Sequence, residues 1–174
     1  MMLEIPALLC CRGGMEPTGK PDAAAALALL KEGNARFAAG TPQHPHQNVA
    51  RLCQAGRESQ ERHAFATVLS CSDSRVPVEL IFDEGVMDLF VVRVAGNICG
   101  PCEAGSIEYG LTHVHTPVLV VLGHTQCGAV TAAVQQPGHD VHGLERNIPA
   151  ILQRIGPAVA RARADAPNAD ADTL

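Results

Sequence analysis

The sequence predicts an α/β fold with a mainly parallel central sheet flanked by helices. Three short apolar runs, residues 65–70, 89–94 and 118–123, lie in the middle of the chain, and none alternates cleanly with polar residues. Such runs are typical of strands buried on both faces of a parallel sheet. Helix-like stretches lie between and after them, and this alternation of strands and helices indicates βαβ units in a doubly wound sheet.

The helices have their own local signals. A first helix is predicted over residues 22–39, with Asp22 as its N-cap, an Ala/Leu-rich body and Gly40 as its stop. Residues 41–48 contain two Pro and two His and predict a loop, and residues 50–61 predict a polar helix. Further helices are expected over residues 78–82, 106–113, 128–135 and 147–164.

The chain is long enough for one domain with a sizeable core, since it has 174 residues of which 47% are apolar. Within this single domain we expect four segments in order. They are an N-terminal extension (1–21), an N-terminal helical arm (22–61), an α/β core (62–164) and a tail (165–174).

The composition of the chain argues against several classes of protein. The formal net charge is -5 and the 13 basic residues form no run, which argues against binding to nucleic acid. No stretch approaches the roughly 20 apolar residues of a membrane span, and the N-terminus lacks the basic start of a secretory signal. Seven cysteines, of which the best placed look like metal ligands, favour a reducing compartment. We therefore expect a cytoplasmic protein with no membrane partner.

Potential metal ligands follow two of the predicted strands. Cys71 comes directly after the first strand, and His124 and Cys127 come directly after the third. In open α/β sheets, ligands collect outside the carboxyl ends of the strands. Two thiols and an imidazole suit Zn²⁺, and three protein ligands rather than four leave one position for water. The sequence therefore predicts a zinc site that can be catalytic.

Two charged residues accompany the first ligand. Asp73 is two positions after Cys71, close enough to reach the metal or its water. Arg75 can hold Asp73 through a bidentate pair, which fixes the carboxylate and keeps it ionised. Two interpretations stay open: Zn²⁺ activates a water beside Asp73, or Asp73 supplies a fourth ligand and the protein is a non-catalytic structural zinc protein.

A second cysteine pair supports a different function. Cys99 and Cys102 form a Cys-Gly-Pro-Cys tetrad after a strand and before a helix, which is the layout of a thioredoxin-like redox site. A thiol–disulfide oxidoreductase is therefore the alternative enzyme, although no Trp precedes the pair. Zinc-dependent nucleobase deaminases use His-x-Glu and Pro-Cys-x-x-Cys, and the chain has neither.

Four sequence blocks resemble the β-class carbonic anhydrases, and the resemblance spans about residues 27–155. The blocks are Cys71-Ser72-Asp73-Ser74-Arg75-Val76, Leu89-Phe90-Val91-Val92-Arg93, Ala95-Gly96-Asn97 and Gly123-His124-Thr125-Gln126-Cys127-Gly128. The resemblance implies a zinc-dependent lyase in which zinc hydroxide attacks carbon dioxide to give bicarbonate and a proton. It implies the metal ligands Cys71, His124 and Cys127, the catalytic pair Asp73 and Arg75, and the pocket residues Val76, Phe90, Gly96, Asn97 and Tyr109.

The resemblance also implies an assembly and shows two departures. Members of the family form a homodimer or a dimer of dimers, in which the N-terminal helices wrap the partner subunit. Members with a regulatory bicarbonate pocket tend to have Trp and Gly where this chain has Val68 and Ser70. Members usually continue past the long helix into a further strand, and this chain has no apolar run for it. We therefore expect the C-terminal strand to be missing.

Overall fold

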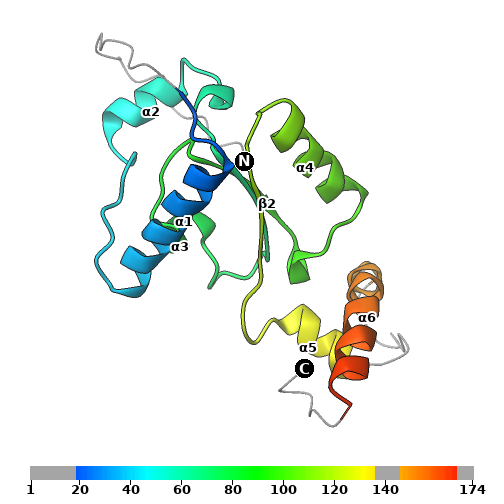
Figure 1. Cartoon of the computed structure of the whole chain (residues 1–174). Coiled ribbons are helices and arrows are strands. Elements are labelled where there is room, and N and C mark those ends of the chain that lie inside the picture. Colours follow the sequence, from blue (N-terminus) through cyan, green and yellow to red (C-terminus); the bar gives the residue numbers. More distant parts are fainter. Residues whose placement is uncertain (1–18, 136–145, 168–174) are drawn as a thin grey trace. The chain divides into compact units, whose positions relative to one another are not determined.

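A three-stranded sheet carries the elements that position the candidate site (Figure 1). The computed structural model describes residues 19–135 and 146–167. Strand β1 (Ala66–Ser70) is central, with β2 (Leu89–Arg93) on one side and β3 (Leu119–Leu122) on the other. The strands coincide with the three predicted apolar runs.

Backbone hydrogen bonds show that β1 and β2 run parallel. The Phe65 N–H donates to the Asp88 carbonyl at 2.9 Å before the strands, and the Val94 N–H donates to the Ser70 carbonyl at 3.1 Å at their ends. Residue numbers therefore rise together along both strands, as the pattern of a parallel sheet requires. The predicted α/β class with a parallel sheet is confirmed.

The chain forms two compact units whose segments interleave along the sequence. The first comprises the described residues up to Val68, Pro77–Val91 and Glu108–Val120; the second comprises Leu69–Val76, Val92–Ile107 and the described residues from Val121 onward. Each of the three strands contributes residues to both units.

The first unit contains the N-terminal helices α1 (Ala23–Ala38) and α2 (Val49–Ala55) and the short helix α3 (Val78–Ile81). The Asp22 side chain caps α1 by accepting a hydrogen bond from the Ala25 N–H at 2.8 Å. Helices α1 and α3 lie side by side (Figure 1). The predicted start and end of the first helix are confirmed within one residue.

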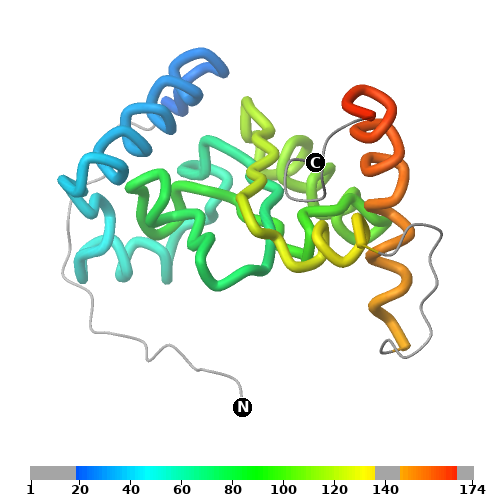
Figure 2. The backbone as a smooth tube through the Cα atoms, turned by 90° about the horizontal axis from the view of Figure 1, so that it is seen from below, coloured from blue at the N-terminus to red at the C-terminus, as the bar shows by residue number. Residues whose placement is uncertain are grey.

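The second unit is built around two helices that follow β3. Helices α5 (Gly128–Gln135) and α6 (Ile148–Asp165) lie side by side in Figure 1 and again in Figure 2, which shows the tube from below. The short 3₁₀ turn η2 (Ala95–Asn97) packs against both helices. The buried core of this layer is aliphatic and consists of Ala133, Val134, Leu152, Ile155 and Val159.

Two predicted helices differ from the structure. Helix α4 (Pro101–Thr112) begins five residues before the predicted start at residue 106, because Gly100 acts as its N-cap. The polar helix predicted over residues 50–61 is split: α2 ends at Ala55, and a 3₁₀ turn η1 (Gln60–Arg62) follows.

The expectation that all three strands are buried on both faces is correct only for β1. Every residue of β1 is buried, whereas β3 alternates between exposed and half-buried residues, with Val121 59% exposed. β2 and β3 are both edge strands, and the described elements leave more of the side chains of β3 uncovered than of β2.

Some predictions fall on residues that the structure does not describe. Residues 1–18 of the N-terminal extension (1–21) lie outside the described residues, and so do residues 168–174 of the tail (165–174). Among the helices of the described part, none combines the length and hydropathy that a membrane span requires.

Candidate metal centre

Three potential ligands meet in the second unit, at the carboxyl ends of β1 and β3. Cys71 directly follows β1, and His124 and Cys127 lie on the turn between β3 and α5. Gln126 in that turn has a φ of 55°, a left-handed conformation that is uncommon outside glycine. Backbone conformations of this kind often occur at functional sites, where the surrounding structure holds them.

The donor atoms are close enough to share one ion. One donor atom from each of Cys71, His124 and Cys127 lies within 4.8 Å of the other two, and the two sulfur atoms are 3.9 Å apart. Both cysteines are buried, and both are free thiols. Sulfur atoms bonded to one tetrahedral Zn²⁺ at about 2.3 Å each are separated by a similar distance.

The hydrogen bonding of His124 leaves the nitrogen that a metal needs. Its Nδ1 lies 2.9 Å from the Thr125 carbonyl oxygen, which can only accept, so Nδ1 carries the proton. In the neutral ring, Nε2 then presents a lone pair. Nε2 is buried and has no hydrogen-bond partner among the described residues. A buried, unpartnered lone pair beside two thiols fits Zn²⁺, and the Thr125 carbonyl fixes the tautomer.

The Cys71 sulfur is stabilised by its surroundings. The Gly96 N–H donates to Cys71 Sγ at 3.3 Å. Burial raises the pKa of the Cys71 thiol, but hydrogen bonds to its sulfur, among them those from the backbone N–H groups of Asp73 and Gly96, outweigh burial and lower this pKa below its ordinary value. Thiolate is the form of cysteine that binds metal, so the lowered pKa favours metal binding.

Asp73 and Arg75 form the predicted bidentate pair beside the donors. Arg75 Nε donates to Asp73 Oδ1 at 2.9 Å, and Arg75 Nη2 donates to Asp73 Oδ2 at 2.7 Å. These bonds hold the pKa of the Asp73 carboxyl well below its usual range. Asp73 Oδ2 is 3.9 Å from His124 Nε2. Arg75 also donates to the Gln126 carbonyl at 3.0 Å, so one guanidinium connects both ligand-bearing turns.

Sequence reasoning assigned no individual role to Arg93, at the end of β2. Its guanidinium donates to the Cys71 carbonyl at 3.0 Å and to the Asp73 carbonyl at 2.7 Å. It therefore holds the backbone of the segment that carries both residues. The only signal in the sequence was a cation at the end of an apolar strand.

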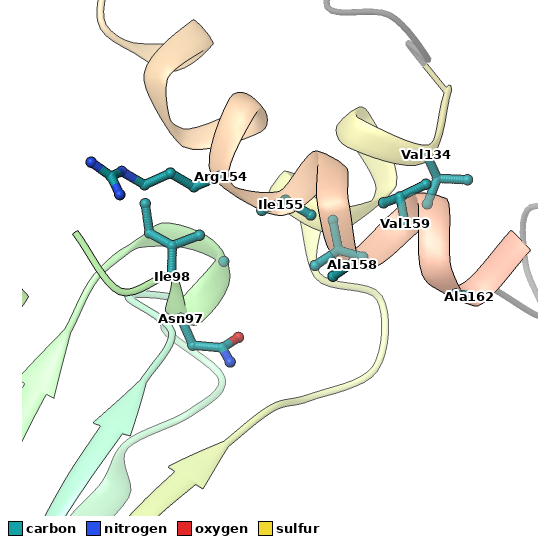
Figure 3. A pocket seen from close by; sticks show the side chains of 10 residues that line it. Asn97, Ile98, Val134, Arg154, Ile155, Ala158, Val159 and Ala162 are labelled. Atoms are coloured by element: carbon teal, nitrogen blue, oxygen red, sulfur yellow. The ribbon is translucent and has the colours of Figure 1, made fainter. Parts of the chain in front are cut away.

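A cavity of about 390 Å³ lies beside η2, α5 and α6 in the second unit (Figure 3). Gly96 and Asn97, two of the predicted pocket residues, contribute to its lining, together with α6 side chains such as Ile155. None of the three potential metal ligands is among the residues that line it. Val76 does not line it either; it is buried, and its N–H donates to the Asp73 carbonyl at 3.0 Å.

The other two predicted pocket residues belong to the first unit. The rings of Phe90 and Tyr109 contact each other with their centroids 6.0 Å apart, and Tyr109 also packs against His113. A Cβ on Gly110 would lie 2.9 Å from Phe90 Cδ1, so the absence of a side chain there makes room for the ring. Their role in a substrate pocket stays a prediction.

The Cys-Gly-Pro-Cys tetrad lies at the start of α4. Cys99 and Cys102 are both exposed and both free. Neither belongs to the group of donors around Cys71. The structure therefore separates the two thiol pairs that the sequence singled out: one is buried with an imidazole, and the other faces solvent.

Comparison with known proteins identifies the family. A sequence model of the family described as carbonic anhydrase matches residues 66–173. Carbonic anhydrase 2 of Mycobacterium tuberculosis is 44% identical over 143 residues, which cover 81% of this chain and 66% of that protein. The chain thus spans about two thirds of the length of this relative.

Solved structures of β-carbonic anhydrases are similar to this chain in fold. A β-carbonic anhydrase of Aspergillus fumigatus matches with a TM-score of 0.58 and 27% identity, covering 86% of this chain and 65% of that one. Tetrameric β-carbonic anhydrases of Sordaria macrospora match with a TM-score of 0.53 and 25% identity, covering 82% and 67%. The family match, the sequence relative and the shared fold together place the chain in the carbonic anhydrase family, in its β-class.

Proposed function

We propose that the chain catalyses the reversible hydration of carbon dioxide to bicarbonate and a proton, with Zn²⁺ held by Cys71, His124 and Cys127. The observation that carries the proposal is the convergence of two buried thiols and a buried imidazole lone pair within 4.8 Å. The name of the M. tuberculosis relative supports the same reaction. When bound, zinc supplies the Lewis acidity that lowers the pKa of a water molecule and gives a nucleophile near neutral pH.

The residues around the donors have distinct tasks in this reaction. Asp73 is kept ionised, so it can accept a hydrogen bond from the attacking water and orient it toward carbon dioxide. Arg75 fixes Asp73 through two hydrogen bonds. Arg93 is a positioning residue, because it acts through the backbone of Cys71 and Asp73. For Val76, Phe90, Gly96, Asn97 and Tyr109 we propose a place in or around the substrate pocket.

The geometry favours an open catalytic site over a closed structural one. Both carboxylate oxygens of Asp73 accept hydrogen bonds from Arg75, and Asp73 is not among the converging donors. A carboxylate that serves as a fourth metal ligand would first have to give up part of this pairing. The fourth position is therefore proposed to belong to water, as in zinc sites that perform catalysis.

We further propose a homodimer or a dimer of dimers. The related S. macrospora enzymes are tetrameric β-carbonic anhydrases. Exposed apolar side chains on α1, namely Leu27, Leu29 and Phe37, support an interface there. We propose carbon dioxide and bicarbonate as the small-molecule partners, and the net charge of -5 argues against nucleic acid. We also propose a cytoplasmic location without a membrane partner, and a single domain, since all three strands contribute to both units.

The test is stopped-flow hydration of carbon dioxide measured against pH and normalised to bound zinc. A rate that rises with pH at about one zinc per chain is expected for a single three-ligand site. A chain that binds zinc fully and shows no activity at any pH would mean a structural site. A Cys71→Ser variant serves as the control, since it removes one donor and should lose both zinc and activity.

A further inference from the structure

The Cys99–Cys102 pair has no task in the proposed reaction. Both thiols are exposed and free, and both belong to the second unit. Exposure makes a thiol accessible to small disulfides and oxidants, in contrast to the buried Cys71 and Cys127. The pair is thus chemically available while the metal ligands are shielded.

The two cysteines stand three positions apart at the start of α4. Gly100 is the N-cap: its carbonyl accepts from the Ala104 N–H at 2.8 Å, and its N–H donates to Glu103 Oε2 at 2.8 Å. Cys99 therefore stands directly before the cap, and Cys102 lies in the first turn. A Cys-x-x-Cys pair at the start of a helix is the layout in which redox proteins close a disulfide, and such a bond needs Cα atoms about 4.4–6.8 Å apart.

Cys99 is also connected to the proposed metal centre. The Arg154 guanidinium of α6 donates to the Cys99 carbonyl at 3.4 Å, and Figure 3 shows Arg154 extending toward the segment that carries Ile98. The next residue, Ile155, packs on Gly96 so closely that a Cβ there would lie 2.8 Å from Ile155 Cδ1. One helix thus holds both Cys99 and Gly96, the residue whose N–H donates to Cys71 Sγ.

We propose that Cys99 and Cys102 form a reversible disulfide by exchange with a low-molecular-weight disulfide, and that this bond weakens zinc retention at Cys71. One protein thiolate attacks a sulfur of the small disulfide and releases one small thiol. The second protein thiolate then attacks the mixed disulfide and releases another. Two cysteines are oxidised, one small disulfide is reduced to two thiols, and the two thiol protons go to the released thiolates.

The direction of the effect follows from the contacts. Closing the sulfur–sulfur bond repositions Cys99 against the Arg154 contact and displaces the segment that leads back to Gly96. The hydrogen bond from Gly96 to Cys71 Sγ then weakens. Zinc release is expected to become about two- to tenfold faster, the range that the loss of one hydrogen bond spans. This second half of the inference rests on the proposed function, whereas disulfide formation does not.

The first experiment detects the bond itself. The zinc-loaded protein is treated with oxidised glutathione, free thiols are alkylated, and the protein is cleaved after glutamate. The fragment 85–103 contains Cys99 and Cys102 and no other cysteine. We expect this fragment to lose the mass of two hydrogen atoms and to resist alkylation. A reduced fragment, a stable glutathione adduct or a link to another chain would each overturn the inference.

The second experiment measures zinc transfer to a chromophoric chelator from the reduced and oxidised protein. Transfer should be faster after oxidation and return to the original rate with dithiothreitol. A Cys99→Ser/Cys102→Ser variant should show one rate throughout, and Cys99→Ser alone provides a second control. Equal rates with the disulfide present would overturn the coupling. If the reduced protein bound no zinc, the proposed function would fail, while the fragment measurement would still decide on the disulfide.

Discussion

Asp73 is the residue whose charge matters most for the proposed reaction. Arg75 keeps its carboxyl ionised, so its task is to accept a hydrogen bond throughout the range near neutral pH. Asp73→Asn keeps the shape of the side chain and removes the charge. We expect the rate of carbon dioxide hydration per bound zinc to fall by about 10²-fold, the lower end for loss of a catalytic base. Zinc content, measured by atomic absorption, should not change.

Asp165→Asn is the matched control for this variant, because Asp165 is exposed at the end of α6. It should retain full activity. Loss of zinc together with activity in Asp73→Asn would contradict the orienting role. It would indicate that the carboxylate is itself a ligand and that the resting site is closed.

Glu84 makes the stability of the first unit depend on pH. Burial and the negative charge of Asp88 raise the pKa of the Glu84 carboxyl from its ordinary 4.5 to about 8. The folded state thus binds more protons than the unfolded state between these values. The contribution of Glu84 is fully present below 4.5 and is lost as pH rises through about 8. Neighbouring Asp83 has the opposite shift, because the Gln43 N–H lowers its pKa to about 2. Its contribution to stability is therefore lost only at acidic pH.

Glu84→Gln should remove most of the stability that the parent chain loses as pH rises through the pKa of Glu84. The free energy of unfolding is measured by urea denaturation at about pH 5 and at about pH 8. Between these two pH values it is expected to fall by about 1–3 kcal/mol less in the variant than in the parent chain. Glu79→Gln is the control, since Glu79 is exposed on α3 and should leave the difference unchanged. An equal fall in all three proteins would show that Glu84 stays ionised in the fold.

Among the elements, α1 depends on a close approach to the chain after α3. A Cβ on Gly33 would lie 1.8 Å from the Phe82 carbonyl oxygen, which no side-chain rotation relieves. Gly33→Ala should therefore destabilise the fold by about 1–3 kcal/mol through overpacking. Gly105→Ala in α4 meets nothing within 4 Å and should be neutral or stabilising by up to about 1 kcal/mol, because Ala favours a helix interior. Urea denaturation compares the two, and equal effects would contradict the close approach.

The elements were predictable where a local signal sufficed. The Asp22 cap, the Gly40 stop and the apolar runs placed α1 and the three strands to within a residue or two. The start of α4 was predicted late, although Pro101 at the first helical position and Glu103 at the third are ordinary signals of a helix start. The exposure of β3 depends on its place in the sheet, and no pattern within four residues contains that information.

At the scale of the whole chain, the metal ligands of the candidate site were more predictable than the residues that hold them in place. Cys71 and His124 are 53 positions apart (124 − 71), yet the rule for strand ends in α/β sheets brings them together. The contacts of Arg93 with two carbonyls and of Gly96 with a sulfur atom were not predictable. These contacts depend on the path of the backbone in space. The sequence alone does not show which side chain or N–H will lie close to a given carbonyl or sulfur atom.

The proposed assembly makes a final prediction about α1. Leu29 is 41% exposed on α1, and Leu27 and Phe37 of the same helix are exposed as well. Light scattering should give the mass of a dimer or a dimer of dimers. Leu29→Glu should weaken association by about 10- to 100-fold, since burying one leucine contributes about 1.5–3 kcal/mol. Lys31→Glu, at an exposed polar position of the same helix, should leave the mass unchanged. A parent chain that stays monomeric at every concentration would mean that this surface serves another purpose.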